Sequence, residues 1–134
     1  MSVFVDTSAF YALLVKDEEG HGPVAETFQK LMREGGSLVT SNYILVETHA
    51  VLQHRFGLDA VRDFQRSLVP LVTVRWIEPD QHRQALERLL KRDHRKLSLV
   101  DCTSFIMMDR EGIRTALALD PDFAENGYEV IPTL

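Results

Sequence analysis

The sequence has a single cysteine, Cys102, so an internal disulfide bond is excluded. Disulfides are rare in reducing compartments, and a lone cysteine therefore favours a cytoplasmic location. Long apolar runs are also lacking. The N-terminal run Val3–Val5 is far too short to span a bilayer, and no basic segment precedes it. We therefore expect neither a membrane span nor a secretory signal.

Positive charge is scarce, because 15 Lys and Arg residues face 20 Asp and Glu residues, for a formal net charge of −5. The total argues weakly against nucleic acid, because binding to its backbone depends on Lys and Arg that neutralise phosphates. The segment from His82 to Lys96 is the exception, since it is rich in Arg and Lys. Two interpretations of this segment remain open: a solvated helix face and a patch that contacts phosphates.

The chain alternates short apolar runs with segments of helical spacing, and its 134 residues suit one domain, residues 1–134. Strands are expected at residues 3–5, 37–40, 71–77, 115–119 and 128–131. Helices are expected at about residues 8–15, 23–34, 42–56, 58–68, 79–94 and 98–111. This alternation predicts an α/β fold, a three-layer α/β/α sandwich around a five-stranded parallel sheet. In such a sheet the carboxyl ends of the strands form the ligand-binding edge.

Two acids lie at that edge. Asp6 ends the first strand, and Asp120 follows the fourth. Each has an ordinary structural explanation. Asp6 or its neighbour Thr7 could cap the next helix, and the Asp-Pro-Asp sequence that begins at Asp120 is a common turn.

Two further acids interrupt the apolar faces of helices. Glu47 shares a helix face with Ile44 and Val51, and Asp101 falls on a similar stripe of a later helix. A lone buried carboxylate is unfavourable by several kcal/mol unless it is paired or bound to a metal. For Glu47 the alternative is a salt bridge to an arginine. For Asp101 it is a capping box with Ser98, which is compatible with a second role.

The four carboxylates together predict a metal site. At separations of about 4–6 Å and an effective dielectric constant near 20, each ionised pair repels by roughly 3–4 kcal/mol. Such a cluster needs protons or cations, and ligands that are all oxygen favour Mg²⁺ or Mn²⁺. The chemistry indicated is metal-assisted attack of water on a phosphodiester bond.

Four motifs carry a family resemblance. They are FVDTSAFYAL with Asp6, SNYILVETHAVL with Glu47, LSLVDCTSF with Asp101, and ALALDPDFAENGYEVIP with Asp120. Over nearly its whole length the sequence resembles PIN-domain ribonucleases, particularly the VapC-like toxins of toxin–antitoxin pairs. Members often have Thr two residues before the last acid, where this chain has Ala118. Asp122 occupies a position that varies in the family, and it is not counted among the expected ligands.

The resemblance implies a PIN-like fold and an endoribonuclease that depends on Mg²⁺ or Mn²⁺. It implies a cognate antitoxin and a homodimer as well. By this resemblance Asp6, Glu47 and Asp101 hold one metal, and Asp120 completes the pocket. The supporting residues are Thr7, Ser8 and Ser104, and Ser104, one turn after Asp101, is expected to donate a hydrogen bond to the Asp101 carboxylate. The candidate RNA contacts are Arg83, Arg88 and Arg92. The alternative function is a non-catalytic PIN-like module that binds RNA or a protein partner without cutting.

Overall fold

The computed structural model describes residues 1–92 and 97–133, except for the side chain of Arg92. Its centre is a parallel sheet with the strand order β3-β2-β1-β4-β5, which confirms the predicted five-stranded sheet. The strands are β1 (Ser2–Val5), β2 (Ser37–Ser41), β3 (Thr73–Arg75), β4 (Thr115–Leu117) and β5 (Glu129–Ile131).

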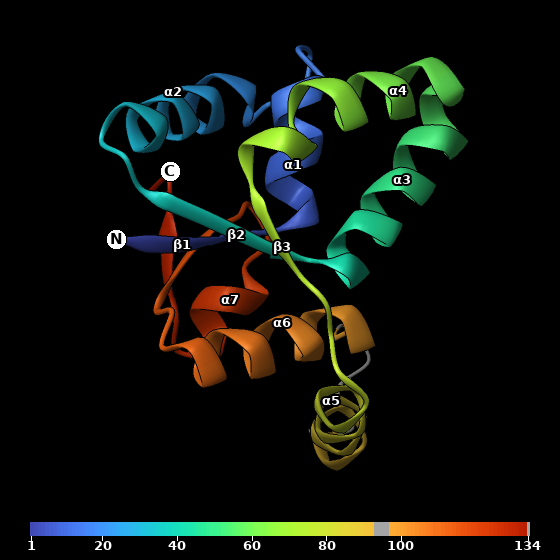
Figure 1. The fold of residues 1–134 in the computed structure, drawn as a ribbon, viewed down its shortest axis with the longest axis vertical. Helices are drawn as coiled ribbons and strands as arrows, with labels where there is room; N and C mark the ends of the chain where they lie inside the picture. The colour runs from blue at the N-terminus through green and yellow to red at the C-terminus, as the bar shows by residue number, and fades with distance from the viewer. Residues whose placement is uncertain (93–96, 134) are drawn as a thin grey trace.

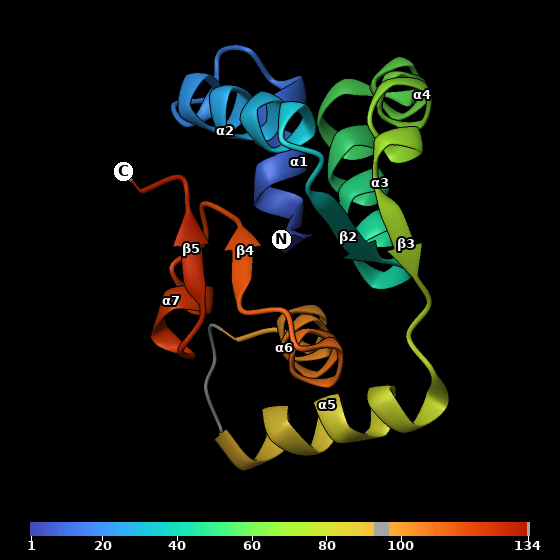
Figure 2. The ribbon, with the colours of Figure 1, turned by 60° about the vertical axis from the view of Figure 1, so that its left-hand side comes forward.

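Helices cover both faces of the sheet, which confirms the predicted three layers (Figure 1; Figure 2). One face carries α1 (Thr7–Leu14), α2 (His21–Arg33), α3 (Asn42–Phe56) and α4 (Leu58–Ser67). The other face carries α5 (Pro79–Arg92), α6 (Leu99–Glu111) and the short α7 (Asp122–Glu125). No helix in the described part of the chain is long and apolar enough to cross a bilayer.

The third predicted strand, residues 71–77, was too long. The 3₁₀ helix η1 (Val69–Leu71) forms around Pro70, so pairing with β2 begins only at Thr73. At the other end, the Ile77 backbone N–H donates to Asn42 Oδ1 at 2.7 Å, outside the sheet ladder. Strand β3 is therefore a short edge strand.

The fourth predicted strand, residues 115–119, was also too long. Strand β4 ends at Leu117, and the backbone N–H of Leu119 donates to the Ser8 hydroxyl instead of to a neighbouring strand. The turn expected at Asp-Pro-Asp leads directly into α7, which the sequence did not predict. The expected end of the fifth helix, near His94, lies outside the described residues.

The core lies on both sides of β1, whose residues Val3, Phe4 and Val5 are completely buried. On the α6 side, Phe105 packs edge to face on Phe123, with ring centroids 5.2 Å apart. Phe105 also stacks on Tyr128 at 5.3 Å. These rings hold α6 against the C-terminal elements of the sheet, and α6 carries Asp101.

Replacing Phe105 with Ala should lower the free energy of unfolding by about 3–5 kcal/mol, because a fully buried ring leaves a cavity. Urea denaturation measures the loss. The matched control is Phe56→Ala. Because the Phe56 side chain is 52% exposed, this substitution should lower the free energy of unfolding by about 1 kcal/mol or less. Equal losses in the two variants would contradict a stabilising role for this aromatic cluster.

Candidate active site

Two of the predicted acids flank the point where the strand order reverses. Strand β1 pairs with β2 on one side and with β4 on the other, which creates a crevice at their carboxyl ends. Asp6 follows β1 directly, and its backbone N–H donates to the carbonyl of Leu117 at 3.1 Å. Asp120 lies just beyond the end of β4. The topology therefore brings Asp6 and Asp120 to the same edge.

The hydroxyl of Ser8 connects these two positions. It donates to Asp6 Oδ2 at 2.7 Å and accepts the backbone N–H of Leu119 at 2.9 Å. The backbone N–H of Ser8 donates to the same Asp6 oxygen at 3.2 Å, which makes Asp6 the N-cap of α1. Asp6 thus caps a helix and also lies at the sheet edge, so its two interpretations are compatible.

Helix α3 places Glu47 beside this edge. Ser41 caps α3 by accepting the backbone N–H of Ile44 at 3.1 Å. Glu47 and Val51, one helical turn apart, line the same cleft as Asp6. Glu47 forms no ion pair within 4.0 Å with any described residue, so the arginine salt bridge that the sequence left open is not found there.

Asp101 is buried at the start of α6 and forms the expected capping box. Its backbone N–H donates to Ser98 Oγ at 3.0 Å, and its Oδ2 accepts the backbone N–H of Ser98 at 3.2 Å. The expected hydrogen bond from Ser104 to the Asp101 carboxylate is absent from the contacts among the described residues. The Ser104 hydroxyl donates to the Val100 carbonyl at 3.2 Å instead, a common alternative within helices.

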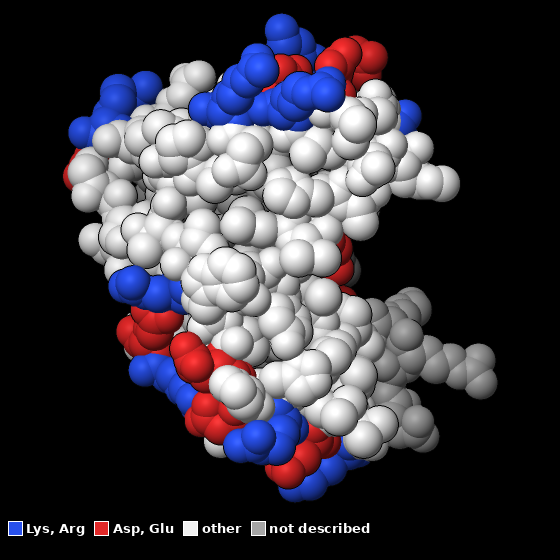
Figure 3. Space-filling model, turned by 45° about the vertical axis from the view of Figure 1, so that its right-hand side comes forward, with Lys and Arg blue, Asp and Glu red and all other residues white. Residues whose placement is uncertain are grey.

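All four predicted acids line one cleft of about 560 Å³. Figure 3 shows acidic side chains at the base of a hollow in the molecule, and both acidic and basic side chains on the outer surfaces. The complete lining is Asp6, Thr7, Ser8, Tyr11, Glu18, Glu47, Val51, Arg55, Ser98, Asp101, Leu119 and Asp120. The cleft therefore contains the predicted ligands together with Thr7 and Ser8.

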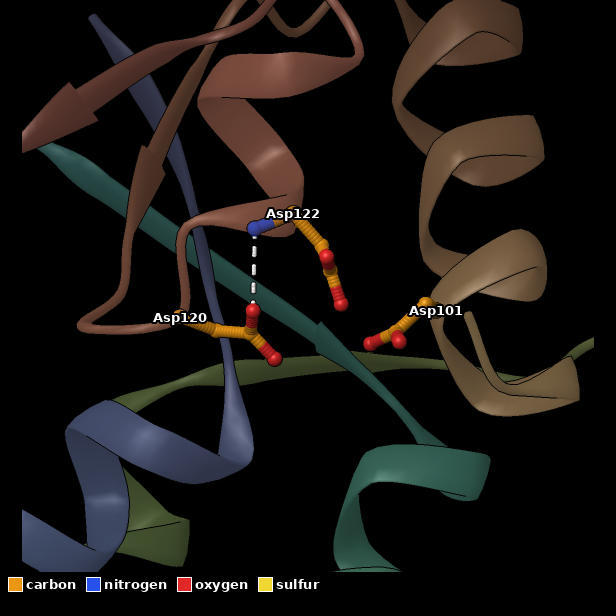
Figure 4. Close-up of side chains that lie close together, drawn as sticks. All are labelled: Asp101, Asp120 and Asp122. Carbon is orange, nitrogen blue, oxygen red and sulfur yellow. Dashed lines mark hydrogen bonds between the residues drawn. The ribbon is translucent and has the colours of Figure 1, made fainter. Parts of the chain in front are cut away.

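Asp122 joins Asp101 and Asp120 in the tightest group of carboxylates (Figure 4). Ligand oxygens of these three residues all lie within 4.8 Å of one another, and no other trio of acidic, His or Cys side chains in the described chain meets this limit. The backbone N–H of Asp122 also donates to Asp120 Oδ1 at 2.9 Å. The sequence missed Asp122 because its signal, an acid two residues after Asp120 in a turn, is common in loops.

Burial changes the acidity of these groups. It raises the pKa of Asp6 to about 7, hydrogen bonds from Ser8 oppose the shift, and the charges of Asp101 and Glu47 add to it. Burial also raises the pKa of Asp101 to about 6, with further contributions from Asp120 and Asp122. The pKa of Asp120 is raised as well, chiefly by burial. The cluster therefore favours protons or cations as counter-charges.

The arginines of α5 that were predicted to contact RNA are not among the described residues that line the cleft. Arg88 forms an ion pair with Asp109 at 3.7 Å, and its guanidinium lies 5.0 Å from the centroid of the Phe105 ring. These contacts give Arg88 a structural role in packing α5 against α6, and they do not support a contact with RNA. Arg83 is exposed, and the side chain of Arg92 lies outside the described residues. Among the described residues, the basic side chain that lines the cleft is Arg55 of α3, which the sequence did not single out.

Comparison with known proteins gives consistent matches. A family model described as the PIN domain matches residues 3–127. The 23S rRNA-specific endonuclease VapC20 of Mycobacterium tuberculosis is 38% identical over 133 residues, which cover 97% of this chain and 98% of that protein. The crystal structure of VapC20, described as a Sarcin-Ricin loop cleaving toxin, aligns with a TM-score of 0.80 and 36% identity over 94% of this chain and 95% of that one.

Two more distant structures share the fold. VapBC2 from Rickettsia felis, bound to a DNA fragment from its promoter, gives a TM-score of 0.72 at 10% identity and covers 97% of each chain. FitAcB from Neisseria gonorrhoeae gives a TM-score of 0.69 at 14% identity, over 97% of this chain and 96% of that one. Together with VapC20, these alignments confirm the PIN-like form of the fold.

Replacing Asp6 with Asn should stabilise the metal-free protein at pH 8. The raised pKa means that the folded state retains a proton which the unfolded state releases as the pH rises above about 4, so stability falls as the pH rises towards 7. Asn caps helices as well as Asp and carries no charge. At roughly 1.4 kcal/mol per pKa unit, the gain at pH 8 is on the order of 2–4 kcal/mol, and it should vanish below about pH 4.

Thermal unfolding in a chelating buffer between pH 4 and pH 8 measures this difference. The matched control is Asp59→Asn, because the Asp59 side chain is 93% exposed and pairs with Arg62 on the surface of α4. This control should show no gain at high pH. A pH-independent effect of Asp6→Asn would contradict the raised pKa.

Proposed function

Since the chain belongs to the PIN-domain family, as its motifs predicted, we propose that it is a metal-dependent endoribonuclease and the toxin of a toxin–antitoxin pair. The observation that carries this proposal is the convergence of Asp6, Glu47, Asp101 and Asp120, from four separate motifs, on one cleft at the switch point of the sheet. This convergence supports metal-assisted hydrolysis in preference to a role in binding alone.

The donor set fits a hard divalent cation, Mg²⁺ or Mn²⁺, because its side-chain ligands are carboxylate oxygens. Asp101 and Asp120, joined by Asp122, offer the closest oxygens, and Asp6 and Glu47 extend the set along the cleft. When bound, such a cation activates water and stabilises the charge that develops on the phosphodiester.

The protein orients three of these ligands through one oxygen of the carboxylate. Hydrogen bonds hold Asp6 Oδ2 to Ser8, Asp101 Oδ2 to the Ser98 backbone, and Asp120 Oδ1 to the Asp122 backbone. The other oxygen of Asp6 and of Asp101 accepts no hydrogen bond from any described residue, and the Asp120 carboxylate also interacts with the Asp122 carboxylate. This arrangement fixes each side chain and leaves one oxygen for a ligand, which is how outer contacts tune metal sites.

We propose that the substrate is ribosomal RNA. VapC20, the relative at 38% identity over nearly the whole length of both chains, is named as a 23S rRNA-specific endonuclease, and its structure as a Sarcin-Ricin loop cleaving toxin. The shared length and the convergent cleft support the same substrate class here. The sarcin–ricin loop is therefore the first RNA to test.

We also propose that a cognate antitoxin is the protein partner of this chain. The description of the VapC20 structure as a toxin supports this proposal. Exposed apolar side chains such as Val46, Phe56, Leu58 and Trp76 offer surface for such a partner and for a homodimer. Copurification with the product of the neighbouring gene tests the antitoxin, and light scattering tests the dimer. The lone cysteine supports a cytoplasmic location as part of the same proposal.

Cleavage of ribosomal RNA should require a divalent cation and both Asp6 and Asp101. Replacing either residue with Asn should lower the rate by at least about a hundredfold, since loss of even an outer-shell contact often costs 10–100-fold. Purified ribosomes, with Mn²⁺ or with a chelator, provide the substrate, and primer extension on 23S rRNA detects the new ends. The surface variant Asp59→Asn should cut like the wild type.

The same assay decides between an enzyme and a binding module. Full cleavage by the Asp6→Asn variant would overturn the assigned metal site. If the wild type binds RNA but cuts none in any cation, the PIN-like binding module is correct instead. Binding by gel shift on the same ribosomal RNA supplies that second measurement.

Asp122 should contribute to the affinity for the cation. Its carboxylate lies in the tightest oxygen group, so Asp122→Asn should weaken Mn²⁺ binding by about 10-fold or more, as Asp120→Asn should. Isothermal titration calorimetry measures both affinities. Glu125→Gln is the control, because Glu125 is an exposed acid on the same short helix α7. An affinity of Asp122→Asn equal to that of the control would exclude Asp122 from the site.

A further inference from the structure

We propose that Arg55 binds a phosphate of the RNA backbone beside the scissile phosphate, and that Tyr11 positions it for this contact. This inference rests on the proposed function and extends it from the metal ligands to the placement of the substrate. Its evidence is the contacts of Arg55, which is not one of the metal ligands. Arg55 and Tyr11 come from two neighbouring helices, α3 and α1, that both line the cleft.

Helix geometry places Arg55 along the cleft from the carboxylates. Glu47, Val51 and Arg55 follow one another at intervals of four residues on α3, and all three line the cleft. Eight residues of helix rise about 12 Å, so the backbone of Arg55 lies about that far along the helix from that of Glu47. A strand of RNA whose scissile phosphate lies at the acids can place a flanking phosphate near Arg55.

Tyr11 holds the Arg55 side chain in the cleft. Arg55 Nη1 donates to the Tyr11 hydroxyl at 2.8 Å, and the guanidinium carbon lies 5.3 Å from the centroid of the Tyr11 ring. Thr7 and Ser8 line the same cleft from one turn earlier on α1. The cation–π contact and the hydrogen bond restrict an otherwise flexible, exposed side chain.

The charge of Arg55 is available to a ligand. Although acids line the cleft, Arg55 forms no ion pair within 4.0 Å with any described residue. A guanidinium has five N–H donors, and the contact with Tyr11 is its one hydrogen bond to the described residues. The remaining donors match the planar, two-pronged geometry by which arginine binds phosphate.

Charge placement explains why RNA needs such a residue. A carboxylate-lined cleft repels a polyanion, and Arg55 is the Lys or Arg among the described residues that line it. A phosphate held at Arg55 enters from the end of the cleft away from the metal ligands. Arg55 therefore contributes to binding and register, and the acids contribute to the chemistry.

A binding experiment isolates this role. The probe is a fluorescein-labelled RNA hairpin with the sequence of the sarcin–ricin loop, and the protein carries Asp101→Asn so that the RNA stays intact. Anisotropy titrations at several KCl concentrations compare this protein with one that also carries Arg55→Gln. We expect Arg55→Gln to weaken binding about 10- to 100-fold and to reduce the slope of log K against log salt by about 0.7–0.9, the value for one lost phosphate contact.

Three companion variants separate charge, geometry and position. Arg55→Lys should retain the salt slope but bind more weakly than arginine, because it loses the two-pronged contact. Tyr11→Phe should weaken binding about threefold with the slope unchanged, because the charge remains while the hydroxyl that positions it is lost. Arg66→Gln removes an exposed arginine from α4, outside the cleft lining, and should change binding less than twofold.

Cleavage kinetics without the Asp101 substitution complete the test. Arg55→Gln should raise KM with kcat within about threefold of wild type, as expected for a contact made equally in the ground state and the transition state. Equal binding by Arg55→Gln and Arg66→Gln, no binding of the hairpin at all, or a loss confined to kcat would overturn the inference. If the Arg55 effects appear but no protein cuts RNA in any cation, the contact stands and the endoribonuclease proposal fails.

Discussion

Mutual repulsion among carboxylates is the constraint on which the candidate site depends. Asp101, Asp120 and Asp122 bring oxygens within 4.8 Å of one another, and the charges of Asp101 and Glu47 act on Asp6. Left to themselves, such groups would separate or take up protons. The fold prevents separation by holding one oxygen of Asp6, Asp101 and Asp120 with hydrogen bonds. For Asp6 and Asp101, helix capping and ligand placement are therefore the same interactions.

The apolar core supplies the stability that this concentration of charge removes. Strand β1 is buried on both faces, and the aromatic group of Phe105, Phe123 and Tyr128 fixes α6 and thereby Asp101. Burial of Asp6 raises its pKa to about 7 and makes the metal-free fold less stable as the pH rises. The metal-free protein is therefore less stable because of a site whose geometry suits a cation. Such a trade-off between stability and function is common at functional sites.

Periodicity in the sequence was sufficient to predict the parallel sheet, its three layers and the positions of the four motif acids. It identified Glu47 and Asp101 because an acid on an apolar helix face conflicts with burial. Spacing could not predict hydrogen-bond partners, so Ser104 was assigned to Asp101 although its hydroxyl donates to Val100. It also could not show that Asp122 turns towards Asp101, or that Arg88 packs on Phe105 while Arg55 enters the cleft. Those outcomes depend on side-chain direction and on contacts between distant segments.

The distribution of charge along the cleft links the two proposed ligands. Without a cation, the carboxylates repel RNA, and a bound cation reduces this local negative charge and offers a positive centre to an approaching phosphate. Metal and RNA should therefore strengthen each other's binding by the same factor, as linkage requires for any two ligands that couple. Arg55 forms no ion pair within 4.0 Å with any described residue, so it can attract a phosphate without a cation first releasing it from an acid. Arg55 therefore contributes to the affinity for RNA in the metal-free protein. The coupling between metal and RNA at the carboxylates makes RNA bind more tightly to the metal-bound protein, which is the form proposed to cut.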